Sequence, residues 1–113
     1  MDISEDRRAD GVILALSGRL DAMTAKAFEE KIVGVISSGT QRLIVDLSHL
    51  DYVSSAGLRV FVVAAKRLRS TQGKIALCSM KDHVREVFDL TGFSSIISIY
   101  GSRDEAYQST IAE

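Results

Sequence analysis

Short runs of strand-forming apolar residues alternate along this chain with longer segments of helical periodicity. After an initial polar stretch, the apolar runs lie at residues 12–16, 43–47, 74–78 and 96–100. Parallel strands need long crossover connections, which helices usually provide, so the alternation predicts a mainly parallel sheet with helices packed on it. An Asp-Gly pair at residues 10–11 favours a hairpin turn after a polar edge strand. The expected fold class is therefore α/β: a mixed, mainly parallel sheet with an N-terminal hairpin and about four helices.

Polar residues and glycines indicate where the strands end. The edge strand is expected at about residues 2–8, before the hairpin turn. Gly18 is predicted to end the second strand. The most hydrophobic strand, 43–47, is predicted to lie in the centre of the sheet, with residues 48–53 as the connection that follows it.

The helices are predicted from capping residues and from apolar periodicity. Asp21 or Thr24 is suited to the N-cap of the first helix, and Gly39 closes it. Ser79 is predicted to cap the third helix, with Asp82 as its capping-box partner. The side chains expected to face inward are Ala27, Phe28, Ile32, Val35 and Ile36 in the first helix, Val84, Val87, Phe88 and Thr91 in the third, and Ala106, Tyr107 and Ile111 in a last helix at about 103–112.

The size and charge of the chain argue against several function classes. Its 113 residues suffice for one continuous core, so a single domain over residues 1–113 is expected, rather than a fragment of a membrane transporter. The formal net charge of −1 gives no general attraction to nucleic acid or to an anionic membrane. The longest apolar run, residues 60–65, is far too short to span a bilayer, and the acidic N-terminus is unlike a secretory signal. We expect a soluble cytoplasmic protein that binds neither nucleic acid nor membranes directly.

Residue patterns that would indicate catalysis or a cofactor are weak. His49 and His83 lie far apart in the sequence and match no metal-ligand spacing, and the glycines form no phosphate-binding motif. The single cysteine, Cys78, lies in an apolar run, where a small buried strand residue is the expected role. Residues 54–57 resemble a nucleophile elbow only loosely, because GxSxG is not matched. We therefore expect no enzyme activity, no metal site and no cofactor.

The strongest functional signal follows the central strand, where serines open a long helix. Either Ser54 or Ser55 is suited to the N-cap. With about 100° of rotation per residue, the face expected to pack on the sheet carries Gly57, Val60, Phe61, Ala64 and Leu68, and the opposite face carries Ser55, Arg59, Val62, Lys66 and Arg69. A phosphate on Ser55 would lie at the positive end of the helix dipole, and would bring about −1.5 to −2 charges to the outer face. The outer face is therefore predicted to be a partner surface that phosphorylation switches.

Four stretches, in order along nearly the whole chain, resemble the STAS domain family, named for sulfate transporters and anti-sigma factor antagonists. They are residues 16–21 (LSGRLD), 43–48 (LIVDLS), 52–58 (YVSSAGL) and 84–93 (VREVFDLTGF). The third stretch resembles the phosphorylation loop of the family, which in many members reads D-S-[ST]-G-L. Aligned on the Gly-Leu pair, the phosphorylated serine falls on Ser55, while Ser54 takes the place of the aspartate and Ala56 that of the second hydroxyl residue.

The resemblance implies a bacterial signal-transduction protein that regulates transcription, an anti-sigma factor antagonist. In partner switching, the unphosphorylated antagonist binds an anti-sigma factor, itself a serine kinase, and so frees the sigma factor. Phosphorylation at Ser55 would reverse this, and a PP2C-type phosphatase would restore binding. Asp21 matches a family position near the switch serine, with Asp46 expected close behind. Together with the outer helix face, the expected partner-binding residues are Asp21, Ser54, Ala56, Arg59, Val62, Lys66 and Arg69.

Three alternatives stay open at the level of sequence. Ser54 is a competing phosphate acceptor. The chain can instead be a non-switching STAS subunit of a signalling complex or of a lipid-transport ABC system, in which Ser55 is never modified. An enzyme or a nucleotide-binding protein that uses the end of the domain near Asp21 and Ser55 is the third alternative.

Overall fold

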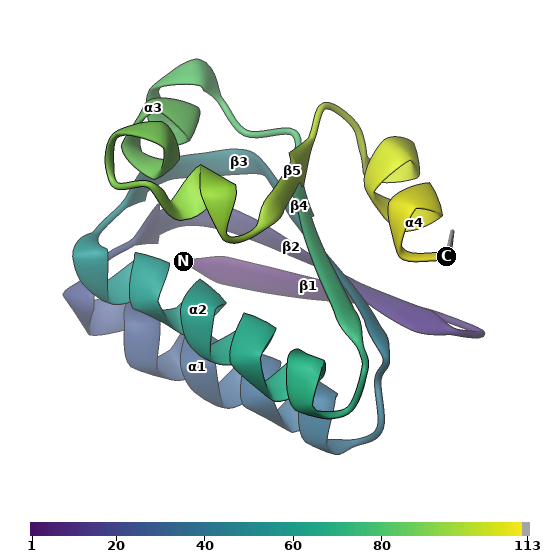
Figure 1. Cartoon of the computed structure of the whole chain (residues 1–113). Helices are drawn as coiled ribbons and strands as arrows, with labels where there is room; N and C mark the ends of the chain where they lie inside the picture. The colour runs from purple at the N-terminus through teal and green to yellow at the C-terminus, as the bar shows by residue number, and fades with distance from the viewer. Residues whose placement is uncertain (112–113) are drawn as a thin grey trace.

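The computed structural model describes residues 1–111 (Figure 1). Five strands and four α-helices make up this part of the chain, with one short 3-10 helix. In chain order they are β1 (Asp2–Arg8), β2 (Gly11–Leu20), α1 (Ala22–Ser37), β3 (Arg42–Val53), α2 (Ser55–Ser70), β4 (Lys74–Cys78), α3 (Asp82–Leu90), the 3-10 helix η1 (Phe93–Ser95), β5 (Ser98–Tyr100) and α4 (Arg103–Ile111). The predicted α/β fold, with its N-terminal hairpin and mixed sheet, is confirmed.

The strands lie in the sheet in the same order as in the chain, β1-β2-β3-β4-β5. β1 pairs antiparallel with β2, and the remaining neighbours pair in parallel. Because crossovers between parallel strands share one hand, three successive steps in the same direction keep the three connecting helices on one face of the sheet. α4 follows the last strand and packs on the opposite face (Figure 1).

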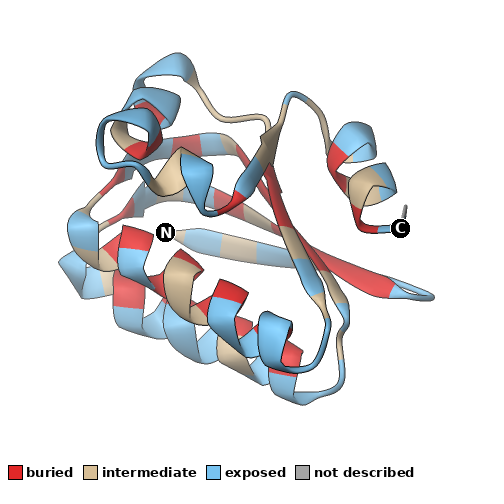
Figure 2. Ribbon diagram, in the orientation of Figure 1, coloured by how far each residue is buried: buried red, intermediate tan, exposed pale blue. Residues whose placement is uncertain are grey.

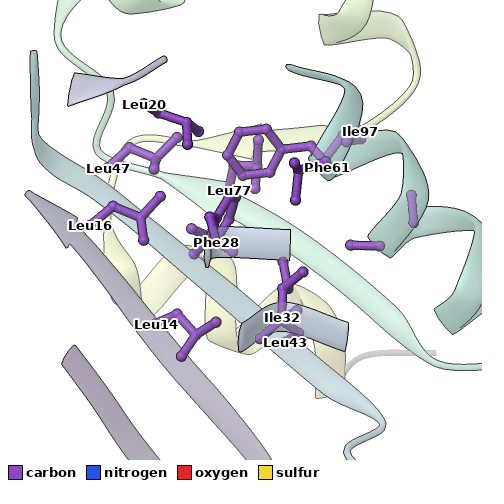
Figure 3. Packing of buried hydrophobic residues seen from close by; sticks show 14 of the residues in the cluster. Leu14, Leu16, Leu20, Phe28, Ile32, Leu43, Leu47, Phe61, Leu77 and Ile97 are labelled. Atoms are coloured by element: carbon purple, nitrogen blue, oxygen red, sulfur yellow. The ribbon is translucent and has the colours of Figure 1, made fainter. Parts of the chain in front are cut away.

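The larger core lies between the sheet and the helices α1, α2 and α3. Side chains alternate along β3, so that Val45 and Leu47 point into this core, whereas Ile44 points to the face that α4 covers. Three phenylalanines, one from each helix, meet at the centre. The ring centroid of Phe61 lies 5.3 Å from that of Phe28 and 5.7 Å from that of Phe88. Figure 3 shows the aliphatic side chains of the strands packed around Phe28 and Phe61.

Two strand predictions are wrong in the same region of the sheet. β2 continues through Gly18 to Leu20, and β3 continues through residues 48–53. Gly18 has a φ of +101°, and the β2–β3 register shifts on either side of it. A positive-φ glycine inside a strand is typical of a β-bulge, which bends the strand without ending it. The hairpin turn also lies one residue earlier than predicted, at Ala9 and Asp10, and Gly11 already belongs to β2.

The helices differ from prediction at one cap and at several inward positions. α3 begins at Asp82 with Lys81 as N-cap, whereas Ser79 has a φ of +64° and caps nothing. In α1 the buried alanine is Ala25, not Ala27, which is exposed. Thr91 and Ile111 are exposed and Tyr107 is half-buried, because α3 and α4 each meet the sheet along a narrower face than predicted. The expected last turn at residue 112 lies outside the described residues.

Candidate functional site

The helices α1 and α2 begin side by side at the carboxyl ends of β2 and β3. Asp21 is the N-cap of α1, and its Oδ1 accepts hydrogen bonds from the backbone N–H groups of Met23 (3.0 Å) and Thr24 (3.1 Å). The Thr24 hydroxyl in turn accepts a bond of 2.9 Å from the Asp21 N–H, which completes a capping box. Of the two predicted caps, Asp21 is therefore the one used.

The two serines at the start of α2 have different environments. Ser54 is the N-cap: its Oγ accepts a hydrogen bond of 3.2 Å from the N–H of Gly57, and its own N–H donates to the carbonyl of Leu20 at 2.8 Å. Ser55 is the first residue of the helix and is exposed. Within residues 1–111 its hydroxyl has no hydrogen-bond partner. The capping role and the free hydroxyl therefore belong to different serines.

A close contact between Gly57 and Leu20 fixes the position of this helix end. A Cβ atom on Gly57 would lie 2.6 Å from Cγ of Leu20 and 3.1 Å from its carbonyl oxygen. These distances leave no room for a side chain, so glycine allows α2 to start directly against the end of β2. Since Leu20 precedes Asp21, the same contact holds the start of α2 beside the cap of α1.

The two faces of α2 are divided as the helical periodicity predicts. Gly57, Val60, Phe61, Ala64 and Leu68 are buried, together with Leu58 and Ala65. On the opposite face Ser55, Arg59, Lys66 and Arg69 are exposed, and Val62 is half-buried. Figure 2 shows this division as buried colour on the sides of α1 and α2 that face the sheet and exposed colour on their outer sides. The outer face of α2 therefore carries one hydroxyl and three cations in a line that begins at the start of the helix.

A shallow groove of about 390 Å³ separates the outer sides of α1 and α2. Its lining includes the small or apolar side chains of Ala25, Val33 and Ala56, and the charged ones of Lys26, Glu29, Glu30, Arg59 and Arg67. Sequence reasoning placed Ala56 and Arg59 in the site but missed the α1 residues. The charged ones, Lys26, Glu29 and Glu30, are exposed on α1, as its helical periodicity implies, but only the packing of the two helices shows that they lie next to α2.

Aromatic and aliphatic surface is also exposed beside the two helix starts. Tyr52 is 39% exposed and Met23 is 91% exposed. The guanidinium of Arg19 lies 4.2 Å from the centroid of the Tyr52 ring, and these two residues are register partners of β2 and β3. Tyr52 and Arg19 lie in the parts of β2 and β3 that the sequence did not predict as strand, so their pairing was not foreseen.

Negative charge is stabilised at the first of these helix starts. Hydrogen bonds from the backbone N–H of Thr24, then from its side chain and from Met23, lower the pKa of Asp21 against the opposing effect of desolvation. A carboxylate at a helix N-terminus also interacts favourably with the helix dipole. Asp21 is therefore an anion next to the serines of α2.

Asp46 does not join this group. Its carboxylate lies on the other face of the sheet, where the guanidinium of Arg103 in α4 donates to Oδ2 at 2.8 Å and 3.1 Å. The expectation that Asp46 lies close behind Asp21 is wrong, because successive residues of β3 point to opposite faces and Asp46 points away from α1 and α2.

The described residues provide no other candidate centre. Across residues 1–111, no three His, Cys, Asp or Glu side chains gather closely enough to hold a metal ion. His49 and His83 are both exposed, and Cys78 is fully buried in β4. None of the helices in that range is both long and apolar enough to cross a bilayer.

Comparisons with known proteins agree with this architecture. The family model for the STAS domain matches residues 2–106. A Bordetella bronchiseptica protein named as a candidate anti-sigma factor antagonist, BtrV, is 43% identical over 100 residues, which cover 88% of this chain and 86% of that protein. An anti-sigma-B factor antagonist of Listeria monocytogenes is 35% identical over 96 residues, covering 84% of this chain and 83% of that protein. The crystal structure of a candidate anti-sigma factor antagonist from Thermotoga maritima superposes with a TM-score of 0.91 at 26% identity, over 97% of this chain and 95% of that one.

Proposed function

This chain belongs to the STAS domain family, and from that membership we propose that it is an anti-sigma factor antagonist. In its unphosphorylated form it binds an anti-sigma factor and so frees a sigma factor for transcription. The bound anti-sigma factor is itself a serine kinase, which transfers the γ-phosphoryl group of ATP to the antagonist. The hydroxyl loses its proton to the kinase, and the phosphorylated antagonist is released. A PP2C-type phosphatase hydrolyses the phosphate and restores binding.

The observation that carries this proposal is the exposed hydroxyl of Ser55 at the first position of α2. An incoming kinase can reach this oxygen without unfolding the helix. A phosphate there receives the favourable field of the helix dipole and of the free N–H groups of the first turn. Ser54 is a poorer acceptor, because its oxygen already accepts the Gly57 N–H and modification would compete with the cap. We therefore assign Ser55 as the acceptor.

The surface around Ser55 supports a mechanism for release. The partner-binding surface that we propose consists of the outer face of α2 and the two helix starts, with the residues Asp21, Ser54, Ala56, Arg59, Val62, Lys66 and Arg69, and it extends into the groove beside α1. A phosphate would bring about −1.5 to −2 charges into this contact, beside the Asp21 carboxylate. A partner matched to a neutral hydroxyl would then meet both repulsion and the cost of burying the charge. Switching requires no change in the fold.

Binding to the anti-sigma factor tests this mechanism. We expect the anti-sigma factor that co-purifies with the protein from its own cells to bind Ser55→Asp at least about tenfold more weakly than the unmodified chain, by titration calorimetry. Gln41→Glu is the matched control, because it adds one negative charge at an exposed site next to the opposite end of β3. Equal affinity of the two variants would contradict the switch. Co-purification with a permease ATPase instead, with no phosphate found, would indicate a constitutive STAS subunit.

A further inference from the structure

The second face of the sheet is covered by α4, which contributes little apolar surface. Beneath it lie the buried side chains of Ile13, Ile44, Ala76 and Cys78. Of the α4 residues, Ala106 and Thr110 are the buried ones, and one of these two is polar. Figure 1 shows the helix lying apart from α1, α2 and α3. Ala106 and the half-buried ring of Tyr107 are the apolar side chains by which α4 packs on this cluster. Their burial provides a small part of the free energy that usually holds a helix on a sheet.

Polar contacts hold the N-terminal end of α4. Arg103 donates from Nη2 and Nε to Oδ2 of Asp46 at 2.8 Å and 3.1 Å, and its Nη1 lies 3.9 Å from Oδ2 of Asp6. The Asp46 side chain is almost buried, at 10% exposure, and its Oδ1 accepts the N–H of Ser48 at 2.9 Å. This carboxylate therefore depends on Arg103 for its charge compensation, and Arg103 depends on it for its position.

A second set of polar contacts holds the middle and the C-terminal end. The Tyr107 hydroxyl donates to Oδ1 of Asp10 in the hairpin turn. Arg42 of β3 donates from Nε to the carbonyl of Thr110 at 2.9 Å, and its Nη1 lies 3.4 Å from Oδ2 of Asp10. The guanidinium of Arg8 lies 5.7 Å from the centroid of the Tyr107 ring. α4 is thus joined to β1, β3 and the hairpin turn by groups that are charged or that bond to charged groups.

We propose that α4 is a detachable cover, whose opening is controlled by the Asp46–Arg103 and Asp10–Tyr107 contacts and exposes the apolar sheet face beneath it. Together these two contacts hold α4 on the sheet. Once one carboxylate is neutralised, little free energy keeps α4 in place, because the helix buries little apolar surface. The three helices on the other face, which share a continuous apolar core, stay in place when α4 opens. The cover is a conformational device of the fold that acts independently of Ser55.

Cys78 provides a direct probe of this opening. It is fully buried on the covered face, and desolvation raises the pKa of its thiol. A thiol reagent such as 5,5′-dithiobis(2-nitrobenzoic acid) therefore reacts with it after α4 has moved. Cys78 is the single cysteine of the chain, so the labelling rate reports on this site alone and no other cysteine has to be replaced.

The experiment compares labelling rates of the full chain at fixed pH. We expect Asp46→Asn and Tyr107→Phe each to increase the rate of Cys78 labelling at least about tenfold, because Asp46→Asn removes the charge that pairs with Arg103 and Tyr107→Phe removes the hydrogen bond to Asp10. Asp89→Asn is the matched control: it removes an exposed ion pair, with Arg85, on α3, and is expected to label at the wild-type rate. The Asp46 carboxylate also acts on the pKa of the Cys78 thiol, so Asp46→Asn could change the labelling rate without opening α4. Tyr107→Phe leaves Asp46 in place and removes a contact with Asp10, so faster labelling of this variant reports opening.

Hydrogen exchange separates opening of α4 from unfolding of the whole chain. In the wild type and in both variants, the amides of residues 106–110 should exchange faster than those of β3 residues 43–47, and the variants should accelerate the α4 amides alone. Labelling of both variants at the rate of the Asp89→Asn control would overturn the proposal. So would faster labelling accompanied by equal acceleration of the α4 and β3 amides, since the probe would then report global unfolding.

Discussion

The two faces of the sheet are covered in different ways. On one face α1, α2 and α3 surround Phe28, Phe61 and Phe88, with apolar side chains from every parallel strand packed against them. On the other face α4 is held by carboxylates, guanidinium groups and a phenol around a small apolar cluster. A charge added to the outer side of α1, α2 or α3 leaves the apolar core beneath these helices intact. Loss of a charge beneath α4 removes the contacts that hold that helix on the sheet. The proposed switch serine lies on the face that tolerates a new charge.

Removal of an aromatic ring from the larger core should have the greatest effect on stability. Phe61→Ala is expected to lower the free energy of unfolding by about 3–5 kcal/mol, because Phe61 is fully buried and contacts both other phenylalanine rings. Denaturant titration followed by far-UV circular dichroism measures the loss. A loss of unfolding free energy below about 1 kcal/mol, in the range of ordinary surface substitutions, would contradict the view that apolar packing holds this face together.

Substitution of two helical glycines tests whether close contact with Leu20 positions α2. Gly57→Ala should destabilise the protein by about 1–3 kcal/mol, because the new Cβ overlaps Leu20 and α2 must shift. Gly34→Ala, in α1, is the control: a Cβ there meets nothing within 4 Å, so the helix propensity of alanine should stabilise by about 0.5–1 kcal/mol. Thermal melts of both variants check the signs. Stabilisation by Gly57→Ala would contradict the close approach of α2 to β2.

Substitution of each serine at the start of α2 should show that helix capping depends on Ser54 and phosphorylation on Ser55. Ser54→Ala is expected to cost about 1 kcal/mol of stability, because the Gly57 N–H loses its acceptor. Ser55→Ala should leave the melting temperature nearly unchanged, since no hydrogen bond is lost. Incubation with the anti-sigma factor and ATP should still phosphorylate Ser54→Ala and should leave Ser55→Ala unmodified. The reverse pattern would assign the switch to Ser54.

Acid should have the smallest overall effect on stability, and it should loosen α4. Burial acts to raise the pKa of Asp46, but hydrogen bonds from the Ser48 N–H and from Arg103 outweigh it, and the pKa lies below the ordinary 3.8. The hydrogen bond from Tyr107 lowers the pKa of Asp10, with a further contribution from Arg42. Both carboxylates therefore stabilise the folded chain above the unfolded pKa, and this stabilisation is lost as pH falls through the lowered values. The groups that face them are Arg103 and Cys78 around Asp46, and Tyr107 and Arg42 around Asp10.

Nuclear magnetic resonance can follow this loss residue by residue. During titration from neutral pH to below about 4, the amide signals of α4 should change before those of residues 60–68 of α2, which contain no carboxylate. Asp46→Asn should show the altered α4 signals already at neutral pH. Simultaneous loss of all signals would mean that the two faces do not open separately.

The order of the elements could be predicted from the sequence because it depends on local periodicity. The division of α2 into two faces follows from the same periodicity, and its buried side is confirmed. Residues 48–53 were not predicted as strand because β4 pairs with β3 only as far as Asp46, so the rest of β3 has β2 as its partner and lacks a continuous apolar run. In β2, the bulge at Gly18 interrupts the run of apolar residues, so the residues after it were not predicted as strand.

The long-range polar contacts could not be predicted at all. Arg103 and Asp46 lie 57 positions apart, and Tyr107 and Asp10 lie 97 positions apart. No local pattern relates residues so far apart in the sequence. The groove beside Ser55 was missed for the same reason, because it exists only when α1 and α2 pack together.

Phosphosite mapping by mass spectrometry on the protein isolated from its own cells, during growth and under stress, tests the switch most directly. We expect a phosphate on Ser55 whose occupancy changes with condition, with Ser54 unmodified. Absence of phosphate from both serines in every condition would contradict partner switching and would favour a constitutive STAS subunit.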